Sequence, residues 1–538
     1  EQTLEGKALT LLERTLPAYF LSCRWFGGKA QQIRSVKKAD IIPFHVNDAS
    51  AFFTTWEIQF LGAAQEVYVL PLAFATGERA FELRQANPQS IVAQLRIKYH
   101  DQEIDGVLYD ALYDANFTKS LLSAVGRGRV YKVQGAALAM VPSKVYRKIS
   151  GGAEGNLEPV ILKREQSNTS VIYGDRMILK LFRRVTEGVN PDVEIGRFLT
   201  DKARFPYSPA LAGSFELRRG RAEPATLGIL QGLVANEGDA WRYTLDSLGR
   251  YSDEILARKP DVQKAAVPMA SPVKFIDEEI PDLARDLIAA YLPSAHLLGQ
   301  RTGELHMALG SEAKDAAFAP ESFTALYRRS LYQSMRTLAD QSLTLLGKRL
   351  KGFAPEQRAD AEKVLHLEDA IFARFRAIAE TKFTAMRIRC HGDYHLGQVL
   401  FTGKDFFIID FEGEPARPIS ERRIKRSPLR DVAGMLRSFN YAAVANLKSD
   451  ALRAEDAAQI RPWAHFWNYW VSVNFLKGYF EAIRQSVFMP KTRSEIALLL
   501  DIFLLEKAVY ELSYELNNRP DWVDLPIAGI LHLMTERE

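Results

Sequence analysis

The stretch that decides the fold is RCHGDYHLGQVLF at residues 389–401, together with FFIIDFE at residues 406–412. The first part predicts a polar turn that ends in a short apolar strand, and the second part predicts another strand after a tight turn. Two strands joined in this way form a hairpin, so we expect Asp393, Gln398 and Asp410 to converge near one edge of it. An acid before the first strand, an amide at its start and an acid after the second strand are what phosphoryl transfer requires.

These side chains divide the expected chemistry between them. Asp393 is the expected catalytic residue, which orients an attacking hydroxyl and accepts its proton. Gln398 and Asp410 offer the oxygen ligands that Mg²⁺ prefers, and we expect them to hold the metal. His395 is expected to support this loop on the substrate side rather than to take the proton, because a carboxylate already occupies the base position. A His-Gly-Asp triplet alone is weak evidence, since Asp at a turn usually bends or caps the backbone.

Elements upstream of the hairpin predict a nucleotide site. Three short strands are expected between residues 160 and 182, followed by a helix that begins at the NPD triplet of residues 190–192. The turn between the first two strands offers backbone N–H groups and small hydroxyls to phosphates. Lys180 would bind the nucleotide's phosphates, and Glu194 would hold the ammonium group of Lys180 in place. A hinge is expected at 230–234, where backbone groups would bind adenine. The expected nucleotide-binding residues are Gln166, Ser167, Asn168, Thr169, Ser170, Lys180, Glu194, Gln231 and Leu233.

Composition indicates a globular protein of several units. The chain has 538 residues, of which 47% are hydrophobic and 25% charged, with a formal net charge of +4. Three or four units of ordinary size are therefore expected, and the small charge gives no reason to expect nucleic acid. Only Cys23 and Cys390 occur, which excludes a disulfide framework and fits a reducing cytosol. No secretory signal or membrane-spanning run is visible, so we expect a cytoplasmic protein without a membrane partner.

The pattern along the chain predicts four regions. Residues 1–90 read as a small α+β unit, residues 91–150 as an intermediate subdomain, residues 151–233 as a strand-rich lobe, and residues 234–538 as a mostly helical lobe. The helical lobe contains the catalytic hairpin. Long helices are expected there at 236–258, 281–311, 320–350 and 356–383.

Two features near the end of the chain predict contacts with an acceptor. A basic cluster consists of Arg417, Arg422, Arg423, Lys425, Arg426 and Arg430, and it fits either a solvated loop or a rim that binds phosphate or sugar hydroxyls. Pyranose rings stack on aromatic side chains, so one or two aromatic residues of the last hundred are expected to face a saccharide while the rest pack. The expected substrate-binding residues are His395, Glu412, Arg423, Tyr441, Trp463 and Trp467. His306, by contrast, is expected to be a packed or surface histidine, because no second ligand stands at metal spacing.

The pattern HGDYHLGQ, followed by an apolar strand that ends in Asp-Phe-Glu, resembles the aminoglycoside-phosphotransferase-like branch of the protein-kinase fold. The residues that follow are similar to the bacterial maltokinases, as are four other segments: RWFGGK at 24–29, QSNTS at 166–170, LKLFR at 179–183 and the C-terminal part at 505–522. This resemblance implies an α+β, two-lobed protein-kinase-like fold, with a β-rich N-lobe, a mostly helical C-lobe and an N-terminal cap subdomain at 1–90. It also implies that Asp431 ties down the catalytic loop from below.

The same resemblance implies a function. A maltokinase uses ATP and Mg²⁺ to phosphorylate maltose at its C1 hydroxyl, and the maltose 1-phosphate formed serves α-glucan (glycogen) synthesis. Gln398 stands where ordinary kinases have Asn, and the maltokinase pattern has Gln too. Many such domains are fused behind a trehalose synthase, which is therefore an expected domain or partner. A chain that starts at Glu1 rather than Met also suggests a trimmed or excised polypeptide.

Other functions stay open at this point. The nearest alternative is the same chemistry on glucosamine or another sugar, since relatives share HGD…GQ and DFEGEP. Aminoglycosides are less favoured, because cationic substrates need a strongly acidic pocket. A different class is a non-catalytic saccharide- or nucleotide-binding module of a fused glucan enzyme. The presence of all four expected functional residues argues against that class: Lys180, Asp393, Gln398 and Asp410.

Overall fold

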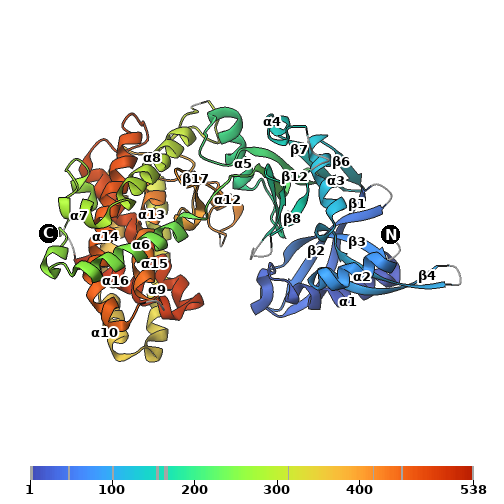
Figure 1. Cartoon of the computed structure of the whole chain (residues 1–538), viewed down its shortest axis with the longest axis horizontal. Helices are drawn as coiled ribbons and strands as arrows, with labels where there is room; N and C mark the ends of the chain where they lie inside the picture. The colour runs from blue at the N-terminus through green and yellow to red at the C-terminus, as the bar shows by residue number, and fades with distance from the viewer. Residues whose placement is uncertain are drawn as a thin grey trace. The chain divides into compact units, whose positions relative to one another are not determined.

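The computed structural model describes residues 4–46, 49–99, 102–152, 157–162, 168–268, 270–312, 314–415, 417–449 and 452–535. The chain divides into two compact units, whose elements are labelled in Figure 1. A sheet-rich unit comprises residues 1–235 and 417–421, and a helix-rich unit comprises residues 236–416 and 422–538. The division falls close to the hinge that the sequence predicts at 230–234.

The first sheet of the sheet-rich unit is antiparallel, in the order β1-β2-β3-β5-β4, with the short β11 paired to β3. Its strands are β1 (Ile33–Val46), β2 (Ala49–Phe60), β3 (Glu66–Thr76), β4 (Ile91–Tyr99), β5 (Gln102–Asp110) and β11 (Arg184–Val185). Helix α1 (Gly6–Ser22) packs on this sheet, because Leu12, Leu16 and Phe20 recur at helical spacing and are buried in one cluster with Trp56.

The second sheet is also antiparallel, in the order β6-β7-β12-β13-β10-β9-β8. Its strands are β6 (Val130–Val133), β7 (Ala136–Pro142), β8 (Pro159–Ile161), β9 (Asn168–Tyr173), β10 (Met177–Phe182), β12 (Leu211–Arg219) and β13 (Ala225–Gly232). The helices of this unit are α2 (Gly77–Ala86), α3 (Ala115–Gly126), α4 (Tyr146–Ser150) and α5 (Pro191–Phe198). The segment 91–150 is thus split, because β4 and β5 belong to the first sheet and β6 and β7 to the second.

A buried ion pair joins the two sheets. Arg183 follows β10, and its Nη2 lies 2.5 Å from Oδ2 of Asp110, with 0% and 1% of the two side chains exposed. The same guanidinium donates through Nε to Oγ1 of Thr169 at 2.8 Å and lies 4.6 Å from the centre of the Trp25 ring. A single hydrophobic cluster also contains side chains of both sheets, among them Phe44 from β1 with strand residues of β9 and β10. The two sheets therefore share one core.

The helix-rich unit consists mainly of helices and two small hairpins. Its helices are α6 (Ala240–Arg258), α7 (Asp282–Ile288), α8 (Tyr291–Leu309), α9 (Ala325–Arg349), α10 (Pro355–His366), α11 (Glu368–Glu380), α13 (Leu429–Leu447), α14 (Ala454–Ala482), α15 (Arg493–Asn518) and α16 (Asp524–Thr535). The hairpins are β14 (Glu321–Ser322) with β15 (Met386–Arg387), and β16 (Val399–Phe401) with β17 (Phe406–Ile408). The short α12 (Ile419–Arg422) follows in sequence, and its residues up to 421 belong to the sheet-rich unit. The helix expected at 281–311 is broken at Ala289, whose φ of 48° is incompatible with a continuous helix.

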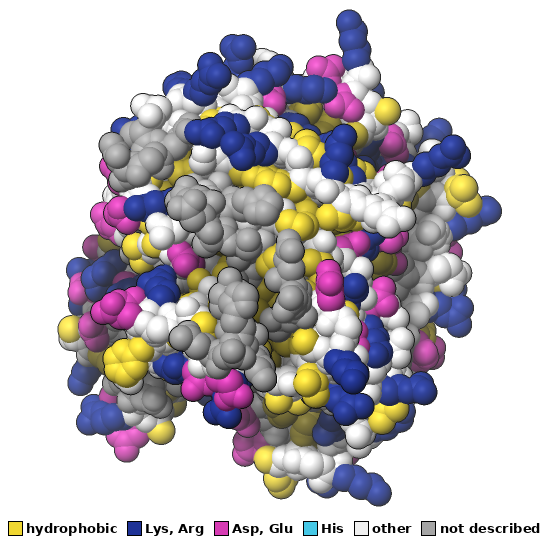
Figure 2. All heavy atoms as spheres, turned by 90° about the vertical axis from the view of Figure 1, so that its right-hand side faces the viewer, with side chains coloured by type: hydrophobic (Ala, Val, Ile, Leu, Met, Phe, Trp, Pro, Cys, Tyr) yellow, Lys and Arg dark blue, Asp and Glu magenta, His cyan; other side chains and the backbone are white. Residues whose placement is uncertain are grey.

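Charges on the molecular surface are mixed. On the face that Figure 2 shows, Lys and Arg side chains are spread around the surface with Asp and Glu among them. None of the helices in the described part of the chain combines the length and the apolar character needed to cross a membrane.

Candidate active site

The segment expected to be catalytic forms the hairpin that the sequence predicts. β16 pairs with β17 so that Val399 lies opposite Ile408, and the N–H of Ile409 donates to the carbonyl of Gln398 at 3.0 Å. This pairing brings Gln398 to the end of the ladder beside Asp410. Asp410 has a φ of 66°, a left-handed conformation that few residues other than glycine adopt. Strain of this kind is retained where the position of a side chain matters for function.

Asp431, in the first turn of α13, holds the turn that precedes Asp393. Its Oδ2 accepts the N–H of His391 at 2.8 Å, and its Oδ1 accepts the N–H of Gly392 at 3.0 Å. Burial raises the pKa of the Asp431 carboxyl, but the hydrogen bond and positive potential of His306 outweigh burial and leave the pKa below its ordinary value. The buried group is therefore a carboxylate that accepts bonds from the loop. The predicted role of Asp431 beneath the catalytic loop is confirmed.

Two further contacts fix the loop on either side of Asp393. The ring of His391 donates from Nε2 to the carbonyl of Ile409 at 2.8 Å, which joins the turn to the end of the second strand. Helix α13 comes very close to the loop at Gly434, where a Cβ would lie 2.5 Å from the carbonyl oxygen of Tyr394. Only glycine allows this approach.

His395 supports the loop that carries Asp393. Its Nδ1 accepts the N–H of Gly397 at 3.1 Å, so the proton of the neutral ring lies on Nε2. Burial lowers the pKa of His395, which keeps the ring neutral at pH 7. The expected supporting contact is present, and a contact of His395 with substrate stays a prediction.

Sequence reasoning missed the side chains of α15 that reach this loop. Nζ of Lys507 lies 3.7 Å from Oδ1 of Asp393 and 4.9 Å from the centre of the Tyr510 ring. Burial raises the pKa of Tyr510, and a hydrogen bond to the carboxylate of Glu414 raises it further, so the phenol is neutral and donates. The sequence of 505–522 shows only a resemblance to the maltokinase C-terminus. No local pattern in this apolar helix distinguishes Lys507 as a residue of the site.

The predicted nucleotide-binding residues divide into three groups. Gln166 and Ser167 lie outside the described residues. Lys180 stands in the middle of β10, opposite Ser170 of β9 and Ile229 of β13. Glu194 lies in the first turn of α5, which Asn190 caps and which starts with Pro191 in its first turn, as the sequence predicts. Asn168 begins β9, and the phosphate contacts of these three polar residues stay predictions.

Other members of that set are engaged elsewhere. Thr169 and Ser170 are buried strand residues rather than part of a polar turn, and the hydroxyl of Thr169 accepts from Arg183, so their hydroxyls are not available as expected. Gln231 is paired through the ladder with strands on both sides. The N–H of Leu233 donates to the carbonyl of Arg176 at 2.8 Å, and an adenine contact of the Leu233 carbonyl stays a prediction.

Two of the predicted saccharide-stacking residues also need correction. Trp463 and Trp467 are 1% and 0% exposed, so neither indole presents a face to a ligand. Tyr441 is half-buried, donates to Oε1 of Glu515 at 3.1 Å and lies parallel to Trp522, and its saccharide contact stays a prediction. Aromatic residues at helical spacing in this region form core.

The basic cluster is partly structural. Lys425 is buried and donates to two backbone carbonyls, at 2.7 Å each, and to Glu321 at 2.8 Å. Arg430 lies 2.7 Å from Glu506. Arg423 is half-buried, as is Glu412, whose carbonyl accepts a weak bond from the neighbouring Arg422 at 3.4 Å. Sugar contacts of Arg423 and Glu412 stay predictions.

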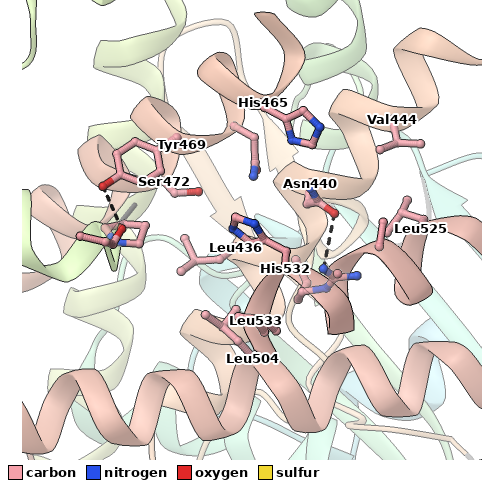
Figure 3. A pocket seen from close by; sticks show the side chains of 16 residues that line it. Leu436, Asn440, Val444, His465, Tyr469, Ser472, Leu504, Leu525, His532 and Leu533 are labelled. Atoms are coloured by element: carbon pink, nitrogen blue, oxygen red, sulfur yellow. Dashed lines mark hydrogen bonds between the residues drawn. The ribbon is translucent and has the colours of Figure 1, made fainter. Parts of the chain in front are cut away.

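A cavity of 190 Å³ lies in the helix-rich unit between α13, α14, α15 and α16 (Figure 3). Leu436 and Asn440 line it from α13, one turn apart on one face of that helix. Asp431 and Ser438, which contact the catalytic loop, are two turns apart and share another face. The cavity is therefore separate from the loop that carries Asp393.

The residues at the end of the hairpin fit a magnesium ion. Gln398 offers an amide oxygen and Asp410 a carboxylate, and the ladder places both at one end of the β16–β17 pair. Hard oxygen ligands of this kind suit Mg²⁺, which binds through one or two protein carboxylates and completes its shell with water and phosphate.

Comparisons with known proteins agree with this geometry. Residues 19–114 match the family model of the maltokinase N-terminal cap domain. A glucosamine kinase from Streptacidiphilus jiangxiensis is 25% identical over 387 residues, which cover 69% of this chain and 73% of that protein. A glucosamine kinase from Mycolicibacterium smegmatis is 24% identical over 379 residues, which cover 69% of this chain and 78% of that protein.

A solved structure of a glucosamine kinase in complex with glucosamine, ADP and inorganic phosphate superposes with a TM-score of 0.60 at 17% identity, covering 97% of this chain and 98% of that one. The chain is a phosphotransferase of the kinase-like fold. The α+β fold class with an N-terminal cap is confirmed, and so is the resemblance to this group of kinases. The cap match extends to residue 114, beyond the expected end at 90.

Proposed function

We propose that this phosphotransferase is an ATP-dependent sugar kinase that phosphorylates maltose at its C1 hydroxyl and releases maltose 1-phosphate for α-glucan synthesis. The observation that carries the proposal is the position of Asp393. It is half-buried on a turn held by Asp431, beside a hairpin that ends in Gln398 and Asp410. The match of residues 19–114 to the maltokinase cap supports maltose as the acceptor.

The proposed mechanism assigns each side chain a separate task. Asp393 accepts a hydrogen bond from the C1 hydroxyl and takes its proton as the oxygen attacks the terminal phosphorus of ATP, whose bond to the bridging oxygen breaks to release ADP. Lys507, 3.7 Å from Asp393, holds this carboxylate in place. On the sheet-rich unit, Lys180 binds phosphate oxygens. Gln398 and Asp410 would hold Mg²⁺, which when bound neutralises charge on the nucleotide phosphates.

Glucosamine is the second candidate acceptor, because the relatives that cover most of the chain carry the name glucosamine kinase. The same base and metal ligands would serve either sugar. A trehalose synthase domain or partner, which would supply maltose, belongs to the maltose proposal and not to the glucosamine one.

The test is ATP consumption with Mg²⁺ and a panel of maltose, glucose, glucosamine, trehalose and kanamycin. Turnover with maltose alone, and a product that is no longer a reducing sugar, are the expected results. Turnover with glucosamine alone would keep the mechanism and replace the acceptor. No turnover with any sugar, combined with tight ATP binding, would favour a non-catalytic binding module.

The catalytic assignment has its own variant pair. Asp393→Asn should lower turnover by about 10²–10⁴-fold, which is the usual contribution of a general base. Asp340→Asn changes an exposed aspartate on α9 and should leave turnover unchanged. Full activity of the Asp393 variant would refute the base assignment.

A further inference from the structure

Helix α8 contacts the hairpin segment at two points and the acid that supports its loop at a third. Arg301 binds the hairpin turn, with Nε and Nη2 each 2.8 Å from a carboxylate oxygen of Asp405. Thr302 shares a hydrogen bond of 2.8 Å with the hydroxyl of Tyr394, next to Asp393 in the loop. One turn further on, His306 reaches Asp431, the carboxylate on which the loop rests. The helix thus follows the catalytic segment along its length.

The contact of His306 is the most enclosed of the three. Its side chain is 0% exposed, with Nε2 at 3.1 Å from Oδ2 of Asp431 and Nδ1 at 3.0 Å from the hydroxyl of Tyr479 on α14. A carboxylate only accepts, so Nε2 of His306 carries a proton and donates it to Asp431. Burial raises the pKa of Tyr479, which keeps its phenol protonated and able to donate.

These bonds form a continuous chain. Tyr479 shares a hydrogen bond with His306, His306 donates to Asp431, and Asp431 accepts from the peptide N–H groups of His391 and Gly392. Oδ2 of Asp431 receives both the histidine and the first of those N–H groups. The ring of His306 therefore fixes the rotation of the carboxylate that orients the turn before the catalytic base.

We propose that His306 is a positioning residue for phosphoryl transfer, which together with Tyr479 sets the orientation of Asp431 and through it the place of Asp393. This inference rests on the function proposed above. The sequence predicts a packed or surface histidine, and His306 is indeed packed; its two hydrogen bonds give it a further task. A histidine that only filled space would not need a carboxylate on one nitrogen and a phenol on the other.

The test compares a variant that removes both hydrogen bonds of His306 with variants that keep one of them. His306→Phe keeps the ring but not the donor, and should lower kcat about 30–100-fold while KM for ATP and for the sugar change less than about threefold, because the base is displaced and not the substrates. His306→Gln retains an N–H donor and should recover most of kcat. Tyr479→Phe removes only the last hydroxyl and should cost about 3–10-fold.

His296 provides the matched control. It lies on the same helix, and its Nε2 is 3.0 Å from Oε2 of Glu481 on α14. Like His306, it therefore connects α8 with α14 through a side-chain hydrogen bond. It is partly exposed, and none of its hydrogen bonds in the described part of the chain reaches the catalytic loop. His296→Phe should leave kcat and both KM values unchanged.

A second readout does not depend on the acceptor. Hydrogen exchange at the amides of His391 and Gly392 should accelerate at least about tenfold in His306→Phe and not in His296→Phe, because the first variant loosens their shared acceptor. A folded His306→Phe protein with wild-type exchange at these amides and wild-type kcat would overturn the inference. If the wild-type protein phosphorylates no sugar, the proposed function fails while the exchange experiment still decides the role of His306.

Discussion

Replacement of Gly434 by alanine offers a test of how the catalytic loop is held. Alanine is favoured over glycine by about 1 kcal/mol inside a helix, so the change alone should stabilise α13. The added Cβ would lie 2.5 Å from the carbonyl oxygen of Tyr394. Relief of this overlap moves the loop by roughly 0.5–1 Å, and overpacking of this kind costs about 1–3 kcal/mol. The net loss of stability should therefore be about 0–2 kcal/mol.

Activity should fall much further than stability. A displacement approaching 1 Å at the base lowers turnover by about 10–100-fold, since the attacking oxygen and the carboxylate must meet within hydrogen-bond distance. The assay pairs steady-state kinetics at 25 °C with urea-induced unfolding followed by fluorescence. We expect Gly434→Ala to remain folded at the assay temperature and to lose most of its kcat.

Gly249→Ala is the control for the helix effect itself. Gly249 lies in the middle of α6, where a Cβ would meet no atom within 4 Å. This variant should gain about 0.5–1 kcal/mol with unchanged kcat. Wild-type kcat in Gly434→Ala would refute the reasoning, because it would mean that the loop does not depend on the close approach of α13.

Three other predictions concern pH, the buried ion pair and the metal. Burial raises the pKa of Asp405, but the hydrogen bonds from Arg301 lower it more, so its contribution to stability is present above pH 4 and is lost as the pH falls through the depressed value. The difference in unfolding free energy between wild type and Asp405→Asn, measured by urea titration, should be constant from pH 5 to 7 and shrink below about pH 4; a constant difference down to pH 3 would contradict the sign. Asp110→Asn leaves Arg183 buried without its counter-charge and should cost about 3–5 kcal/mol by the same assay, and a loss under 1 kcal/mol would show that the pair is dispensable. Gln398→Ala should raise the Mg²⁺ concentration for half-maximal turnover by about tenfold after EDTA treatment, whereas an unchanged requirement would remove Gln398 from the metal site.

Local patterns predicted the elements that stand alone in sequence. The hairpin after Asp393 follows from two apolar runs and a tight turn, and the start of α5 follows from its NPD triplet, because both signals involve neighbouring residues. The helix expected at 281–311 failed at Ala289, since a left-handed residue other than glycine leaves no mark in the pattern. The sheet to which each strand of 91–150 belongs depends on distant partners and was not predictable from this segment alone.

The candidate site was predictable where one short segment carries it. Asp393 was singled out on a loop that the structure fixes to Asp431. Lys507 was missed because its contact with Asp393 joins residues more than a hundred positions apart. Trp463 and Trp467 were assigned to a saccharide because a buried and a ligand-facing aromatic residue look alike in a sequence. Burial, which decides between them, is a property of the packed fold.

The ion pair between Asp110 and Arg183 has a consequence for modularity. The region that matches the cap family ends at residue 114. Two of its residues, Asp110 and Trp25, contact Arg183, which lies outside the matched region and follows β10 of the second sheet. A chimaera that exchanged the cap for that of a related kinase would inherit this arginine, and it would fold well only if the new cap supplied an acid and an aromatic face at the same places. The cap is thus a region of sequence that can be recognised on its own but not a part that can be exchanged on its own.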